Sequence, residues 1–228
     1  MAFHHSPKVI TDQLQLSLDA GDSNSYPGSG TAWYDLSKNG YHATLGSSVS
    51  YSATTFGGSL QTLNNAENTN QTIASNSFGN VYWNNFTFEI WFSNDGSQGG
   101  DPSAFGFDNG GITSYGARYN GTIQNWVNGT LHITSAGVSS ATIPTQLVYT
   151  GNGTVFTSYI NTVQADTDTT SATNDGPAMT DYTMNFNGST SSNNGWNGRY
   201  CVCRFYSKVL SQLEITQNYN VMINRFST

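Results

Sequence analysis

Three tryptophans, each with an asparagine beside it, are the clearest candidates for recognition chemistry in this sequence. An indole face can stack on a sugar ring, and an amide can hydrogen-bond to sugar hydroxyls. The candidates for carbohydrate binding are Trp83, Trp126, Trp196 and Asn197. Each tryptophan also has an alternative role in the hydrophobic core, because a chain of 228 residues needs large aromatic side chains inside.

Acid–base catalysis requires paired groups, and the sequence offers few. Glycoside hydrolases place two carboxylates across the scissile bond. Glu89 lies in a strong strand pattern, but its same-face neighbours Thr87 and Trp91 are not acids. We interpret Glu89 as a polar residue on the solvent side of its strand or as a cross-strand partner. The four histidines show no His-Glu-x-x-His spacing, and no serine is framed as Gly-x-Ser-x-Gly, so we predict that the protein is not an enzyme.

Metal and redox chemistry have equally little support. A calcium ion needs six to eight oxygen ligands, and no run of acids has a known calcium-loop spacing, so we predict no cofactor and no metal. Bound Ca²⁺ remains the alternative, with loop ligands from Asp95, Asp101, Asp108, Asp166, Asp168, Asp175 and Asp181. Cys201 and Cys203 are too close in sequence for an unstrained mutual disulfide. We expect both to be reduced and buried.

Composition restricts both the architecture and the partners. Only 9% of residues are charged, with 7 Lys+Arg against 14 Asp+Glu and a net charge of −7. Long solvated helices need more charged residues than this. An acidic chain with scattered basic residues also lacks the positive patch that binds nucleic acid or anionic membranes. No apolar run is long enough to span a bilayer, and the N-terminus does not resemble a signal peptide.

Short alternating runs separated by turn residues dominate the chain. Leu14 to Leu18 and Phe86 to Phe92 alternate with a period of two, and Asn-Gly and Gly-rich turns recur between such runs. Ser211 and Glu214 form a capping-box pattern that predicts one short helix near the C-terminus. We therefore predict an all-β antiparallel sandwich or barrel, with an N-terminal arm at 1–11 and a single domain at 12–228.

Several segments resemble a known family. The matching stretches are Leu18 to Gly40 with Ala43 to Leu45, Phe86 to Trp91, Gly151 to Asn161, and Arg204 to Asn220. They are similar to the laminin G-like, concanavalin A-like jelly-roll domains of tailed-bacteriophage structural proteins. Thr162 stands where that family usually has glycine, and Cys203 where it usually has an acid. In the first stretch, Asp35 is expected to bond local backbone amides.

The resemblance implies a fold and a role. The expected fold is a concanavalin A-like jelly roll with one short C-terminal helix. The expected function is a non-enzymatic virion structural protein displayed on the particle surface, most simply as capsid decoration, assembled in the host cytoplasm. Its partners would be capsid or tail subunits, with self-association into a homo-oligomer as a further option. The alternative is a carbohydrate-binding receptor module of a tail, neck or fibre protein that binds host surface glycans.

The N-terminal arm is the candidate attachment segment. Its apolar residues would need cover, and the candidates for contact with a neighbouring virion protein are Phe3, Lys8, Val9 and Ile10. Such a contact would either pair Lys8 to Ile10 as an added strand or insert Phe3 into a pocket. The alternative is that Val9 and Ile10 begin the first strand of the domain's own sheet.

Overall fold

The structure, a computed structural model, confirms the predicted all-β sandwich. It describes residues 8–62, 73–75, 85–95, 105–108, 113–114, 117–119, 123–127, 130–135, 142–169, 183–186 and 196–226. Within those ranges every element is a strand except the 3-10 turn η1 (Thr55–Gly57) and the helix α1 (Gln212–Phe226). No helix of these ranges has the length and apolar character needed to cross a membrane.

The larger sheet contains eight antiparallel strands. Their order is β15-β14-β13-β7-β17-β5-β4, and β1 pairs with β17 on the edge that β5 also uses. The strands are β1 (Leu14–Asp19), β4 (Ser50–Ser52), β5 (Ser59–Thr62), β7 (Phe86–Asn94), β13 (Thr145–Gly151), β14 (Phe156–Ile160), β15 (Val163–Asp168) and β17 (Gly198–Tyr206). Residues from both ends of the chain thus meet in the middle of one sheet.

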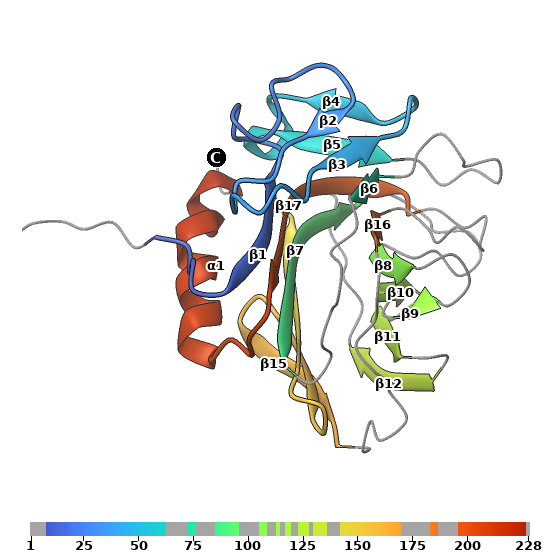
Figure 1. Cartoon of the computed structure of the whole chain (residues 1–228), viewed down its shortest axis with the longest axis vertical. Helices are drawn as coiled ribbons and strands as arrows, with labels where there is room; N and C mark the ends of the chain where they lie inside the picture. Colours follow the sequence, from blue (N-terminus) through green and yellow to red (C-terminus); the bar gives the residue numbers. More distant parts are fainter. Residues whose placement is uncertain are drawn as a thin grey trace, which may run out of the picture.

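The second layer consists of shorter strands. One sheet has the order β2-β3-β6-β16-β8-β9, and a second has the order β10-β11-β12. These strands are β2 (Ala32–Trp33), β3 (Ala43–Leu45), β6 (Ile73–Ser75), β8 (Phe105–Asp108), β9 (Thr113–Ser114), β10 (Ala117–Tyr119), β11 (Ile123–Val127), β12 (Thr130–Ser135) and β16 (Thr183–Phe186). Figure 1 shows β6, β8 and β16 on one side of β7 and β17, and α1 on the other.

Hydrophobic side chains fill the space on both faces of the larger sheet. The cluster between the sheets includes Leu16, Leu18, Trp33, Leu45, Phe88, Ile90, Phe92, Leu147 and Phe205. Two clusters lie beneath α1: one holds Trp91, Val202, Met222 and Phe226, the other Val148, Tyr206, Leu210 and Ile215. Strand β7 is therefore buried from Phe86 to Ser93, although an alternating pattern alone suggests one wet face.

The closing strand β17 departs from strict alternation. Cys203 belongs to the cluster between the sheets, together with Phe205 two residues further on. Cys201 does not, because the register shifts between Tyr200 and Val202, and Cys201 packs with Val202 beneath α1. Both cysteines are free and buried, as predicted, and burial raises the pKa of each thiol.

Two connections have backbone angles that favour glycine. Asn161 and Thr162 form the two-residue connection between β14 and β15, and their φ angles are 47° and 71°. Such a turn favours glycine at its second position, so the β-branched Thr162 is strained there. Gly58 has a φ of 116°, and an added Cβ would lie 2.4 Å from the Cα of Gly21. Only glycine fits at that crossing.

Candidate functional site

The structure places Trp196 inside the core, which confirms the core interpretation of this residue and excludes its indole as an exposed sugar platform. Its side chain is fully buried, and its ring lies 5.2 Å from that of Phe92 in an edge-to-face arrangement. Its Nε1 donates a 2.8 Å hydrogen bond to the backbone oxygen of Ser93. The ring and its one donor are both used within the protein.

The other carbohydrate candidates keep their status as predictions. Asn197 is half-buried, and its backbone oxygen accepts a 3.0 Å hydrogen bond from the N–H of Asp95. Trp126 lies in β11. Trp83 lies outside the described residues.

A compact polar group adjoins Asn197 at the start of β17. Arg199 Nε lies 2.9 Å from Asp95 Oδ2, and the Ser93 hydroxyl donates to Asp95 Oδ1 over 2.8 Å. Arg199 Nη2 also donates to Gln61 Oε1 over 3.0 Å. The guanidinium and carboxylate neutralise one another, so this group stabilises the end of the sheet and offers no unpaired charge to a ligand.

Glu89 lies fully buried beneath α1, at the centre of the larger sheet. Its Oε1 accepts hydrogen bonds from Trp91 Nε1 at 3.0 Å, Gln146 Nε2 at 2.9 Å and Arg204 Nη1 at 3.1 Å. Its Oε2 accepts a 2.8 Å hydrogen bond from Asn218 Nδ2 of the helix. The expectation of a cross-strand partner is confirmed, because Arg204 faces Glu89 in the β7–β17 register. The solvent-side alternative is wrong, because α1 covers that face.

The ion pair between Glu89 and Arg204 has a structural role. Burial lowers the pKa of Arg204, but the charge and hydrogen bond of Glu89 outweigh that effect and raise it above its usual value. Arg204 Nη2 also reaches Met222 Sδ at 3.3 Å, and Asn218 Nδ2 reaches the Tyr206 hydroxyl at 3.0 Å. The pKa of the Tyr206 hydroxyl is also raised, first by its burial and second by the charge of Glu89. The helix is therefore fastened to the sheet by polar as well as apolar contacts.

The N-terminal segment is also tied to the helix. Ile10 N–H donates to Asn218 Oδ1 over 2.9 Å, and Gln217 Nε2 donates to the backbone oxygen of Lys8 over 2.6 Å. The backbone N–H of Ile10 and the backbone oxygen of Lys8 are thus already bonded to the helix. Strand β1 starts at Leu14, so Val9 and Ile10 do not begin the first strand. Phe3 lies outside the described residues, and attachment through Phe3, Lys8, Val9 or Ile10 stays a prediction.

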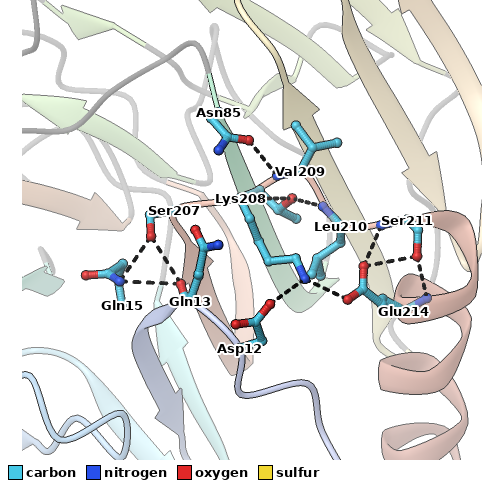
Figure 2. A network of polar contacts seen from close by, with 11 residues as sticks. Asp12, Gln13, Gln15, Asn85, Ser207, Lys208, Val209, Leu210, Ser211 and Glu214 are labelled. Carbon is cyan, nitrogen blue, oxygen red and sulfur yellow. Dashed lines mark hydrogen bonds and ion pairs between the residues drawn. The ribbon is translucent and has the colours of Figure 1, made fainter.

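A second junction joins the two ends of the domain, and Figure 2 shows it around Lys208. Its Nζ lies 2.9 Å from Asp12 Oδ2 and 2.8 Å from Glu214 Oε1. Glu214 Oε2 accepts from the backbone N–H and the hydroxyl of Ser211, which confirms the predicted capping box. Burial raises the pKa of Glu214, but hydrogen bonds from Lys208 and Ser211 outweigh it and lower the pKa below its usual value.

The loop after β2 is held by Asp35, as expected. Its Oδ1 accepts from the backbone N–H groups of Ser17 at 2.9 Å and Ser37 at 2.8 Å. Its Oδ2 accepts from the Ser37 hydroxyl at 2.7 Å and the Tyr41 N–H at 3.1 Å. The N–H of Asp35 donates to His42 Nδ1 at 3.0 Å. These bonds fix both sides of the loop.

Tyr34, in that loop, is the feature that the sequence analysis missed. Its side chain is 43% exposed, and it is the only aromatic among the large exposed hydrophobic residues of the described chain. Its ring meets that of His42 edge to face, with centroids 5.3 Å apart. The sequence feature that could have identified Tyr34 is the strand alternation at β2. Because Trp33 is fully buried, the next residue faces outward.

Metal ligation has no support in the described ranges. No three His, Cys, Asp or Glu side chains there come together in a way that could hold an ion. Several of the aspartates considered for calcium, including Asp101, Asp175 and Asp181, lie outside those ranges. The prediction of no cofactor, and the calcium alternative, both stay untested.

The jelly-roll sandwich with its terminal helix defines the class as concanavalin A-like. Residues 64–216, more than half of the chain, match the Laminin_G_3 family model, described as the concanavalin A-like lectin/glucanases superfamily. The chain belongs to this family. No curated protein matches the sequence closely enough to count as a relative.

Solved structures show the same fold at low sequence identity. The binding domain of Paraclostridial Mosquitocidal Protein 1 is 17% identical with a TM-score of 0.69, covering 92% of this chain and 52% of that one. Domain 4 of AbnA, an extracellular arabinanase from Geobacillus stearothermophilus solved with arabinotriose, is 13% identical with a TM-score of 0.66, covering 92% and 98%. The botulinum neurotoxin type G receptor binding domain is 12% identical with a TM-score of 0.67, covering 92% and 51%.

The chain thus spans about half the length of the two toxin domains and nearly all of the arabinanase domain.

Proposed function

We propose that this protein is a non-catalytic carbohydrate-binding domain. The observation that carries the proposal is its similarity, along almost the whole of both chains, to an arabinanase domain solved with arabinotriose. The similarity to toxin binding domains supports a recognition role for the same fold. This favours the glycan-binding alternative of the sequence analysis.

The buried state of Glu89 supports the non-catalytic part of the proposal. A glycosidase carboxylate must reach the glycosidic oxygen or the anomeric carbon of its substrate. Glu89 lies beneath α1, and its oxygens accept from four donors, one of them the Arg204 guanidinium. A carboxylate held in this way is not accessible to a substrate.

A printed glycan array with the purified chain tests the binding proposal. We expect selective binding that isothermal titration confirms with the free oligosaccharide. Incubation of the same oligosaccharide with the protein should release no reducing sugar. Binding to no glycan would overturn the carbohydrate proposal, and sustained release of reducing sugar would overturn the non-catalytic part.

Display on a phage virion is the narrower part of this proposal. It rests on the resemblance of the Leu18 to Gly40 and Arg204 to Asn220 segments to phage structural domains. The similar structures named above do not bear on it. Imaging of assembled particles tests it: density for about one copy per capsid subunit would support decoration, and particles that lack the protein would refute a virion role.

A further inference from the structure

We propose that Tyr34 and His42 form a contact site for a neutral sugar ring. The inference rests on the proposed carbohydrate-binding function and names the place where that function resides. An exposed aromatic ring, a neighbouring N–H donor and a rigid backbone beneath them each favour the recognition of a sugar by stacking.

The first observation is the exposure of the Tyr34 ring. Single exposed hydrophobic residues are common on protein surfaces, so exposure alone has little weight. In an edge-to-face pair, however, one ring turns its edge to the face of the other, so a ring face remains outside the pair. With centroids 5.3 Å apart and planes at 79°, Tyr34 and His42 have this arrangement. A sugar can stack on the remaining face.

The second observation is a donor of defined position. His42 Nδ1 accepts the N–H of Asp35, so Nε2 is the ring nitrogen that carries an N–H. That N–H can donate to a hydroxyl or ring oxygen of a sugar placed on Tyr34.

The third observation is the rigidity of the support. The backbone N–H of Tyr34 donates to the backbone oxygen of Ser25 at 2.7 Å, and the Ser25 hydroxyl donates to the backbone oxygen of Tyr34 at 2.6 Å. The next residue, Asp35, is held in place by four hydrogen bonds that its carboxylate accepts. The backbone order that binding would require is thus already present before a ligand arrives.

Charge selects the class of sugar. The chain has 14 Asp+Glu against 7 Lys+Arg and a net charge of −7. Sialylated, sulfated or uronic acid sugars would be repelled by this field. A neutral oligosaccharide is therefore the expected ligand.

The test uses an array of neutral arabino-, galacto-, gluco- and manno-oligosaccharides together with sialylated and sulfated counterparts. We expect Tyr34→Ala to weaken binding of the preferred neutral oligosaccharide about tenfold or more, as for a central aromatic contact. Tyr34→Phe, which retains the ring, should stay within about threefold of the wild type. Leu213→Ala is the matched control, because Leu213 is 82% exposed but lies in the first turn of α1. Thermal unfolding verifies that each variant is folded.

The outcomes separate the two proposals. Weaker sugar binding by Tyr34→Ala, with Tyr34→Phe and Leu213→Ala close to the wild type, supports the site. Wild-type binding to a neutral sugar that Tyr34→Ala leaves unchanged overturns the site but retains the carbohydrate-binding function. Wild-type binding restricted to sialylated or sulfated sugars overturns the neutral class. A wild type that binds none of the printed glycans overturns both proposals.

Discussion

Replacement of Glu89 by glutamine is the sharpest test of how this fold is held together. Glutamine has nearly the same shape, so it removes the charge without opening a cavity. One amide oxygen can still accept hydrogen bonds from Trp91, Gln146 and Arg204. The amide NH₂, however, would face the Nδ2 donor of Asn218, which now bonds to Glu89 Oε2 over 2.8 Å.

The expected cost follows from the burial of Arg204, whose side chain is only 3% exposed. Removing one partner of a buried ion pair typically costs about 3–5 kcal/mol, because the remaining charge has no compensation. Asn218 cannot relieve the donor conflict by rotating its amide without losing the bond from Ile10 to its Oδ1. We therefore expect Glu89→Gln to lower the free energy of unfolding by about 3–5 kcal/mol.

Urea unfolding followed by tryptophan fluorescence measures the effect. With a denaturant slope of about 2–3 kcal/mol/M, the midpoint should fall by between about 1 and 2.5 M. Arg204→Met and the double variant Glu89→Gln/Arg204→Met complete the cycle. Because the double variant leaves no unpaired charge, it should lose clearly less stability than the sum of the single variants. A Glu89→Gln protein within about 1 kcal/mol of the wild type, or additive single effects, would refute this account.

Three further predictions concern the backbone and the thiols. Thr162→Gly should raise the free energy of unfolding by about 1 kcal/mol in urea titrations, because glycine relieves the strain at φ 71°; an unchanged midpoint would contradict that strain. Gly58→Ala should destabilise by more than about 3 kcal/mol, through both the φ of 116° and the clash with Gly21, whereas Gly30→Ala, with φ 88° and open space around it, should cost only about 1 kcal/mol. Equal losses in the two alanine variants would show that the clash is unimportant. Cys201 and Cys203 should resist iodoacetamide in the folded protein and react after unfolding, since burial raises the pKa of each thiol; mass spectrometry that finds rapid native labelling would refute their burial.

The local chemistry of the chain could be predicted from sequence. The capping box at Ser211 and Glu214 and the anchoring role of Asp35 each depend on residues within a few positions of one another. Such contacts form wherever the chain makes the turn, so their signals survive in the linear sequence.

Contacts set by strand register and by the helix could not be predicted in this way. The alternation in Phe86 to Phe92 indicates that the strand has two different faces, but it does not reveal that α1 covers the face opposite the second sheet layer. The partner of Glu89 depends on the β7–β17 register, and the position of Cys201 depends on the shift between Tyr200 and Val202. The choice between core and surface for Trp196 was left open for the same reason: an asparagine beside a tryptophan does not reveal which way the ring points.

The burial of both faces at the centre of the larger sheet limits where this domain can bind anything. Residues of β7 and β17 face either the second layer of strands or α1, and the Glu89–Arg204 ion pair between these two strands is closed within the protein. A ligand would have to displace α1 to reach them, which would break the contacts of Asn218 with Glu89, Tyr206 and Ile10 together. Recognition by the described part of the chain must therefore occur outside that centre. The loop that carries Tyr34 meets this condition, because its hydrogen bonds hold it rigid without enclosing the ring.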